Sequence, residues 1–218
     1  MKENPFDLFS GEYEDWFSEN AVAFRSEVLA LRQLIPQEKQ GLEIGIGSGI
    51  FARELGIPCG IDPSENMLRL ARERGLNVMR GYAEQLPYKD QSFDYAAFIT
   101  SLCFISHPRK SLQEAFRVIR DGGTLVVAII DRESALGRRL EEEKASSKFY
   151  RQARFYSVPE MLKLMMQASF EISRIIQTLA EPPGEVPEKP IKGYGKGGFV
   201  VIEAIKIRRR PMTPGNHP

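Results

Sequence analysis

The sequence predicts an α/β fold in which helices cover both faces of a mostly parallel sheet. Segments with strand character alternate with segments with helix character between Gly41 and Ile130, which is the pattern of parallel strands joined by helical crossovers. The first of these strands runs directly into three glycines, Gly45, Gly47 and Gly49, and a helix follows. Glycines at such a turn let the backbone bend tightly and approach a ligand closely.

Length and composition fit one globular domain. The chain has 218 residues, of which 27% are charged and 42% hydrophobic, and its formal net charge is +1. This near balance of charge gives no reason to expect a nucleic-acid partner, and the three basic residues Arg208, Arg209 and Arg210 are too few to indicate one.

Targeting and membrane signals are not found in the sequence. Residues 1–10 lack the basic stretch and apolar run of a signal peptide, and no apolar run reaches about 18 residues, so we expect no membrane span. Two cysteines, Cys59 and Cys103, make neither a disulfide framework nor a metal site. We therefore expect a cytoplasmic protein without a metal, whose oligomeric state the sequence leaves open.

The N-terminal part combines an aromatic segment with a helix. Apolar residues at 24, 28, 31 and 35 are spaced four, three and four apart, which predicts one helix face, and Pro36 ends the helix. Tyr13, Trp16 and Phe17 precede this helix. They can be a packing staple for it, or a lid over a ligand at the edge of the sheet.

The spacing of the glycines separates two kinds of nucleotide site. A dinucleotide fingerprint, G-x-G-x-x-G, would need glycine at position 50, where this chain has Ile50. Glu43 precedes Gly45 by two residues, and its carboxylate disfavours a pyrophosphate nearby and favours a cationic amino group. These features argue against an NAD-dependent oxidoreductase.

The second predicted strand, Cys59–Asp62, also ends in an acid. Asp62 follows Gly45 by seventeen residues, and a carboxylate at the end of the second strand of a βαβ unit can accept both hydroxyls of a ribose. Pro63 follows, and Ser64 is the expected N-cap of the next helix.

The rest of the chain carries similar local signals for strands and helices. We predict strands at 78–81, 93–99 and 124–130, with a helix at 108–120 before a glycine turn. A charged segment fills 131–156. Ser157 and Glu160 open another helix, and strands at 170–179 and 198–207 are expected to pair as an antiparallel hairpin, because the loop between them is too short for a parallel crossover.

Four motifs in order resemble those of the class I S-adenosylmethionine-dependent methyltransferases, in particular the small-molecule enzymes similar to ubiquinone and menaquinone methyltransferases. The motifs are E-I-G-I-G-S-G at 43–49, D-P-S-E-N-M-L-R-L-A at 62–71, G-Y-A-E-Q-L-P-Y at 81–88 with S-F-D at 92–94, and R-V-I-R-D-G-G-T-L at 117–125. The resemblance implies a Rossmann-like sheet of seven strands, mostly parallel, with the last strand antiparallel.

The same resemblance implies one methyltransferase domain at 1–207. It would consist of an N-terminal lid and helix (1–36), a cofactor-binding core (40–130), a helical insertion (131–156), and a C-terminal helix and hairpin (157–207), followed by a basic flexible tail (208–218).

S-adenosylmethionine is the implied cofactor and S-adenosylhomocysteine the product. Relatives contact adenine through the backbone at the position of Ala83, and because Tyr82 stands where they often have Asp, the contact with the adenine amine is assigned to Glu84. The full set of expected cofactor-binding residues is Glu43, Gly45, Gly47, Asp62, Pro63, Ala83, Glu84 and Thr100.

The acceptor is expected to be a small molecule of undetermined identity. The segment 100–108 lacks the motif of adenine or glutamine methyltransferases and the Pro-Cys nucleophile of RNA cytosine-C5 enzymes, and no catalytic base stands out. Tyr13, Trp16 and His107 are the lid or acceptor candidates, although the sequence favours His107 as the start of a helix. A non-catalytic module that binds S-adenosylmethionine for regulation is the alternative function.

Overall fold

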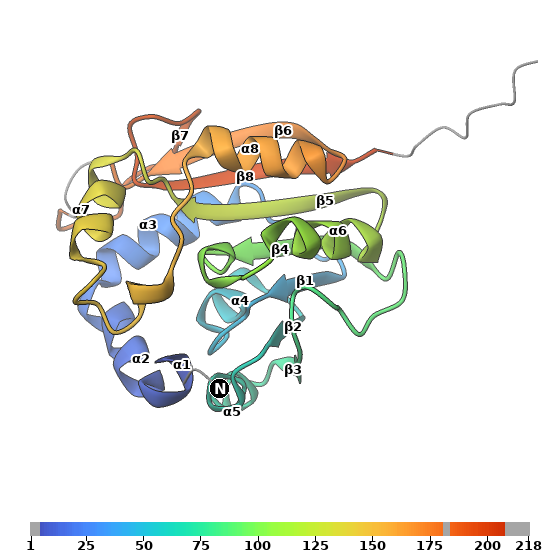
Figure 1. Cartoon of the computed structure of the whole chain (residues 1–218), viewed down its shortest axis with the longest axis horizontal. Helices are drawn as coiled ribbons and strands as arrows, with labels where there is room; N and C mark the ends of the chain where they lie inside the picture. Colours follow the sequence, from blue (N-terminus) through green and yellow to red (C-terminus); the bar gives the residue numbers. More distant parts are fainter. Residues whose placement is uncertain (1–4, 181–183, 208–218) are drawn as a thin grey trace, which may run out of the picture.

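The computed structural model describes residues 5–180 and 184–207 and contains an eight-stranded sheet (Figure 1). The strands lie in the order β3-β2-β1-β4-β5-β8-β6-β7. Their bounds are β1 Gly41–Ile44, β2 Cys59–Asp62, β3 Asn77–Arg80, β4 Phe93–Ile99, β5 Ile119–Ile130, β6 Phe170–Thr178, β7 Ile191–Lys192 and β8 Phe199–Lys206.

Eight α-helices lie within the described ranges. They are α1 Pro5–Leu8, α2 Ser10–Glu19, α3 Ala21–Arg32, α4 Ile50–Leu55, α5 Glu65–Glu73, α6 Pro108–Val118, α7 Ala135–Glu143 and α8 Val158–Gln167. Two short 3₁₀ helices, η1 Leu102–Phe104 and η2 Tyr150–Gln152, follow β4 and α7. In this part of the chain no helix has the length and apolar character needed to cross a membrane.

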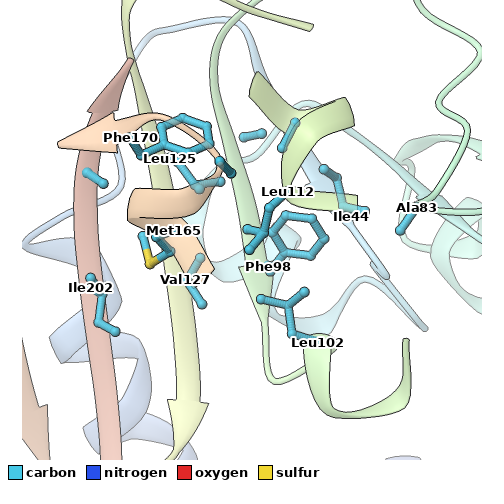
Figure 2. Close-up of a cluster of buried hydrophobic side chains, with 14 of the residues drawn as sticks. Ile44, Ala83, Phe98, Leu102, Leu112, Leu125, Val127, Met165, Phe170 and Ile202 are labelled. Atoms are coloured by element: carbon cyan, nitrogen blue, oxygen red, sulfur yellow. The ribbon is translucent and has the colours of Figure 1, made fainter. Parts of the chain in front are cut away.

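Helices cover both faces of the sheet, as predicted. On one face, α6 and α8 pack against the strands through a buried apolar cluster; Figure 2 shows Leu112 of α6 and Met165 of α8 among the side chains of β4, β5 and β8. On the other face, α3 and α4 contribute Leu31, Phe51 and Leu55 to a second buried cluster. The sheet is therefore buried on both sides, which is typical of parallel sheets.

The predicted hairpin is confirmed, and two other expectations are corrected. β8 pairs antiparallel with both β5 and β6. The sheet has eight strands rather than seven, because the two-residue strand β7 pairs with the end of β6. β5 begins at Ile119 rather than at 124, because α6 ends at Val118 and the backbone becomes extended at once.

Helix caps appear at the residues that the sequence indicated. The Ser64 Oγ accepts a hydrogen bond from the Met67 amide at 3.2 Å at the start of α5. At the start of α8, Ser157 and Glu160 form a reciprocal capping box. These caps set where each helix leaves the strand edge, and so they position the loops of the site.

The carboxyl ends of the parallel strands meet at one edge of the sheet. In Figure 1, the segment after β4, the helices α1 and α2, and the α7 region all gather toward this edge. In open α/β sheets this is the edge where ligands bind. The expected basic tail, 208–218, lies outside the described residues.

Candidate functional site

The glycine turn after β1 leaves room for a ligand at one of its three glycines. All three have left-handed backbone conformations, with φ of 77° at Gly45, 54° at Gly47 and 76° at Gly49. A Cβ atom at Gly45 would lie 2.5 Å from the Ser101 Cβ, and one at Gly49 would lie 2.2 Å from the Leu76 Cδ1. A Cβ at Gly47 would have nothing within 4 Å. The outer glycines therefore serve protein packing, while Gly47 faces open space.

Asp62 lies directly beside that open space. Its Oδ2 accepts a hydrogen bond from the Gly47 amide and its Oδ1 accepts one from the Ser64 amide, both at 2.9 Å. Burial raises the pKa of this carboxyl group to about 6, although the two amides lower it in part. Each carboxylate oxygen keeps a lone pair for a further donor, such as a ribose hydroxyl.

Glu43 supplies a buried carboxylate at the end of β1. Its side chain is 2% exposed, and its Oε2 atom has no hydrogen-bond partner among the described residues. Burial, together with the nearby charge of Asp62, raises its pKa well above the usual value. A buried carboxylate oxygen without a partner is costly and fits a site that receives a cationic group.

The turn after β4 is strained and tied to β1. Thr100 has a φ of 50°, which is unusual for a β-branched residue, and its amide donates to the Ala128 carbonyl at 3.0 Å. The Ser101 Oγ donates to the Ile44 carbonyl at 2.7 Å. Strain of this kind is concentrated at ligand sites, and here it brings Thr100 to the edge where the glycine turn lies.

Other predicted residues surround this edge. Ala83 is buried, and the Glu84 Oε1 accepts a hydrogen bond from the His107 amide at 3.3 Å. The His107 side chain is exposed at the start of α6, so its observed role is that of a helix start. The Pro63 carbonyl accepts a hydrogen bond from the Arg80 Nε at 3.1 Å.

The two aromatic lid candidates point in different directions. The Tyr13 ring is partly buried and lies 5.6 Å from the ring of Phe6 and 5.8 Å from that of Phe149. Trp16 is 42% exposed and touches the buried ring of Phe17 edge-on. Tyr13 therefore faces the interior of this end of the molecule, whereas Trp16 covers Phe17 from outside.

Polar contacts hold α1 and α2 against the edge of the sheet that carries the glycine turn. Asp7 is joined to the start of α5, because its Oδ1 accepts a hydrogen bond from the Ser64 Oγ. Glu14 of α2 forms an ion pair with Arg74, and the same guanidinium donates to the Ser48 carbonyl at 3.0 Å. Arg74 thus joins the glycine turn to α2.

Aromatic residues that the sequence analysis did not single out complete this region. Phe104 of η1 lies 4.9 Å from Phe6 and stacks on Tyr150 of η2 at 6.0 Å, measured between ring centroids. The Tyr150 ring packs in turn against Phe155 at 5.4 Å. The signal that could have found them is a clustering of aromatic residues at three separate loops of the same predicted sheet edge.

Comparison with known proteins identifies the fold and the chemistry. Residues 42–127 match the family model described as a methyltransferase domain. A solved structure from Thermotoga maritima, described as a SAM-dependent methyltransferase and possible histamine N-methyltransferase, is 46% identical and superposes with a TM-score of 0.90 over 93% of this chain and 98% of its own.

Two sequence relatives span nearly the whole chain. An uncharacterized protein of Methanocaldococcus jannaschii is 42% identical over 94% of this chain and 100% of its own length. The demethylmenaquinone methyltransferase of Oceanobacillus iheyensis is 24% identical over 90% of this chain and 87% of its own. The similarity therefore extends well beyond the glycine turn.

Proposed function

We propose that this chain, which belongs to the S-adenosylmethionine-dependent methyltransferase family, methylates a small molecule. Methyl transfer from S-adenosylmethionine, with S-adenosylhomocysteine as product, follows from the family. The bound donor supplies a methyl carbon that its sulfonium already activates. The chain's own contribution is to position the reactants and exclude water, which can lower a barrier by roughly 7–11 kcal/mol.

The observation that carries the donor site is the open side of Gly47 beside Asp62, with the buried Glu43 within electrostatic range of Asp62. Asp62 lies beside Gly47 and is suited to the ribose hydroxyls. Glu43, whose Oε2 atom has no hydrogen-bond partner in the described part of the chain, is suited to the cationic amino group. We assign the donor to these residues together with Gly45, Pro63, Ala83, Glu84 and Thr100.

A closed aromatic end of the molecule supports a small acceptor. Phe6, Tyr13, Phe104 and Phe149 pack ring against ring near this sheet edge, and we expect the acceptor to contact them. Histamine and demethylmenaquinone, the compounds in the names of two relatives, are both small organic molecules.

The free thiols of Cys59 and Cys103 favour a reducing, cytoplasmic location.

Calorimetric titration tests the donor assignment. We expect S-adenosylmethionine and S-adenosylhomocysteine to bind with similar affinity, and NAD to give no measurable heat, because Glu43 disfavours a pyrophosphate. Tight NAD binding without any response to the two adenosyl compounds would show that the donor site is wrongly assigned.

We further propose that α1 and α2 form a lid and that Arg74 holds it to the donor site. Replacing Arg74 with glutamine removes its ion pair with Glu14 and its hydrogen bond to the Ser48 carbonyl. We expect S-adenosylhomocysteine to slow hydrogen exchange across residues 9–20 in the wild type, and Arg74→Gln to lose this protection and bind about fivefold more weakly, since a partly buried charge pair contributes about 1 kcal/mol or more.

Arg72→Gln is the matched control for this prediction. Arg72 lies two residues earlier and pairs with Glu65 on the surface of the same helix. The substitution Arg72→Gln should leave unchanged both the affinity for S-adenosylhomocysteine and the protection of residues 9–20 from hydrogen exchange. If exchange across 9–20 does not respond to ligand even in the wild type, then α1 and α2 are a structural staple and the lid proposal fails.

A further inference from the structure

Glu27 is a buried carboxylate that neither the sequence analysis nor the donor site accounts for. It lies on α3, where it is 5% exposed, among buried neighbours that include Val28 and Leu31. Burial alone raises the pKa of its carboxyl group to about 8, and no hydrogen bond or cation in the described part of the chain lowers that pKa. Burying this acidic side chain therefore reduces the free energy of unfolding.

The surroundings of Glu27 place it at the aromatic end of the site. Its charge raises the pKa of two phenols, Tyr13 on α2 and Tyr150 on η2. The Tyr13 phenol also lies within electrostatic range of Glu43 and Asp62, the carboxylates of the donor site. Phe24, one turn before Glu27 on α3, packs its ring against Phe17, and Phe17 packs against Tyr13, with ring centroids 5.2 and 5.1 Å apart. The side of α3 that carries Glu27 therefore borders the aromatic end of the site.

The walls of this region are aromatic. Tyr13 packs against Phe149, Phe149 against Phe6, and Phe6 against Phe104, with ring centroids 4.9 to 5.8 Å apart. Aromatic faces bind flat apolar molecules and also attract cations. Within these walls, a lone buried carboxylate is complementary to a basic nitrogen rather than to an anion or a neutral alcohol.

We propose that Glu27 binds the protonated nitrogen of the acceptor and that the acceptor is therefore an aromatic or apolar amine. This inference rests on the proposed methyltransferase function and names the substrate class of the same site. A carboxylate and an ammonium group that are buried together attract each other, which offsets part of the cost of burying either charge alone.

The carboxylate also provides the proton acceptor that the reaction needs. Glu27 takes one proton from the ammonium group and becomes a neutral acid, which leaves a free electron pair on the nitrogen. That pair forms the new N–C bond while the bond between sulfur and the methyl carbon breaks, and the electrons of the broken bond remain on sulfur. The methylated nitrogen carries the positive charge away, and Glu27 returns its proton to solvent after the site opens. Proton and charge are balanced without any further reactant.

Binding to the full-length protein saturated with S-adenosylhomocysteine tests this inference without turnover. Three probes of similar shape are compared by calorimetry: 2-phenylethylamine, 2-phenylethanol and 3-phenylpropionate. We expect the amine to bind at least about tenfold more tightly than the alcohol, and the acid most weakly. In Glu27→Gln the amine should lose this advantage and bind like the alcohol, whose own affinity should not change.

Two controls separate recognition from folding. Glu27→Gln should melt at the same temperature as the wild type or higher at pH 8. Because the pKa of Glu27 is raised, the folded wild type binds more protons than the unfolded chain, and its stability falls as the pH rises from 4.5 to about 8. The amide of Glu27→Gln does not titrate, so the variant does not lose this stability. Glu19→Gln, on the exposed end of α2, should keep the amine preference.

The possible outcomes are distinct. A preference for the amine that survives in Glu27→Gln, an equal loss of amine and alcohol binding, or a wild type that fails to bind the amine would each overturn the role of Glu27. Failure of S-adenosylhomocysteine to bind would instead contradict the proposed function, and the first titration shows it before any acceptor probe is added.

Discussion

Gly47→Val should remove measurable binding of S-adenosylhomocysteine, a loss of roughly a hundredfold to a thousandfold or more. The space at this glycine is open in the structure, with nothing within 4 Å of an added Cβ, and we assign that space to the ligand. A valine side chain would occupy it. The φ of 54° is in addition a conformation that a β-branched residue adopts only with strain. Calorimetry with the adenosyl product measures the loss directly.

Gly56→Val is the matched control for this substitution. Gly56 ends α4 with a φ of 70° and likewise has nothing within 4 Å of an added Cβ. Valine there should cost a similar amount of stability, roughly 1–2 kcal/mol from backbone strain, and leave ligand affinity intact. Normal binding by a folded Gly47→Val variant would mean that the open space at Gly47 does not belong to the donor site.

Asp62→Ala should weaken binding of the product by roughly a hundredfold. Two charge-assisted hydrogen bonds to the ribose hydroxyls would be lost, at about 1.5 kcal/mol each at the low end of their range. The turn would also lose the carboxylate that accepts from the Gly47 amide. Asp90→Ala, on the exposed loop before β4, is the control and should bind normally. An unchanged dissociation constant in Asp62→Ala would put this carboxylate outside the donor site.

The raised pKa of Asp62 gives this second prediction a pH signature. The ionised carboxylate is the stronger hydrogen-bond acceptor, so affinity should be constant above the free protein's pKa of about 6 and should fall as the pH drops below it. The groups near it are Asp7, whose charge contributes to the raised value, the amides of Gly47 and Ser64, and the buried carboxyl group of Glu43. Asp62→Asn should lack this pH dependence, because its side chain does not titrate.

Most of the sheet could be predicted because its signals are local. The strand at 93–99 and the strand end at Asp62 follow directly from apolar runs closed by turn residues, and the structure has both. β7 could not be predicted, since two residues in a Pro- and Gly-rich loop have no strand pattern of their own and pair only because β6 presents an edge there. The early start of β5 depends likewise on its pairing with β4 and not on its residues.

The proximity of Gly47 and Asp62 could be predicted from the sequence, whereas the position of Glu27 could not. Gly47 and Asp62 belong to one continuous βαβ unit, so their spacing along the chain fixes their proximity. Glu27 and Tyr150 are far apart in sequence and come within electrostatic range only through tertiary packing. One signal was nevertheless present: Glu27 falls on the buried side of its helix, three residues after Phe24 and four before Leu31, where a charged residue has no solvent to face.

The double contact of Arg74 has a kinetic consequence. One guanidinium touches both the glycine turn, to which we assign the donor, and α2, which we propose closes over it. Donor binding at the turn and closure of α2 are then thermodynamically linked. If donor binding favours closure by a given factor, closure strengthens donor binding by the same factor. We expect such an enzyme to load its donor first and release the demethylated product last, in an ordered sequence whose slowest step is reopening rather than bond formation.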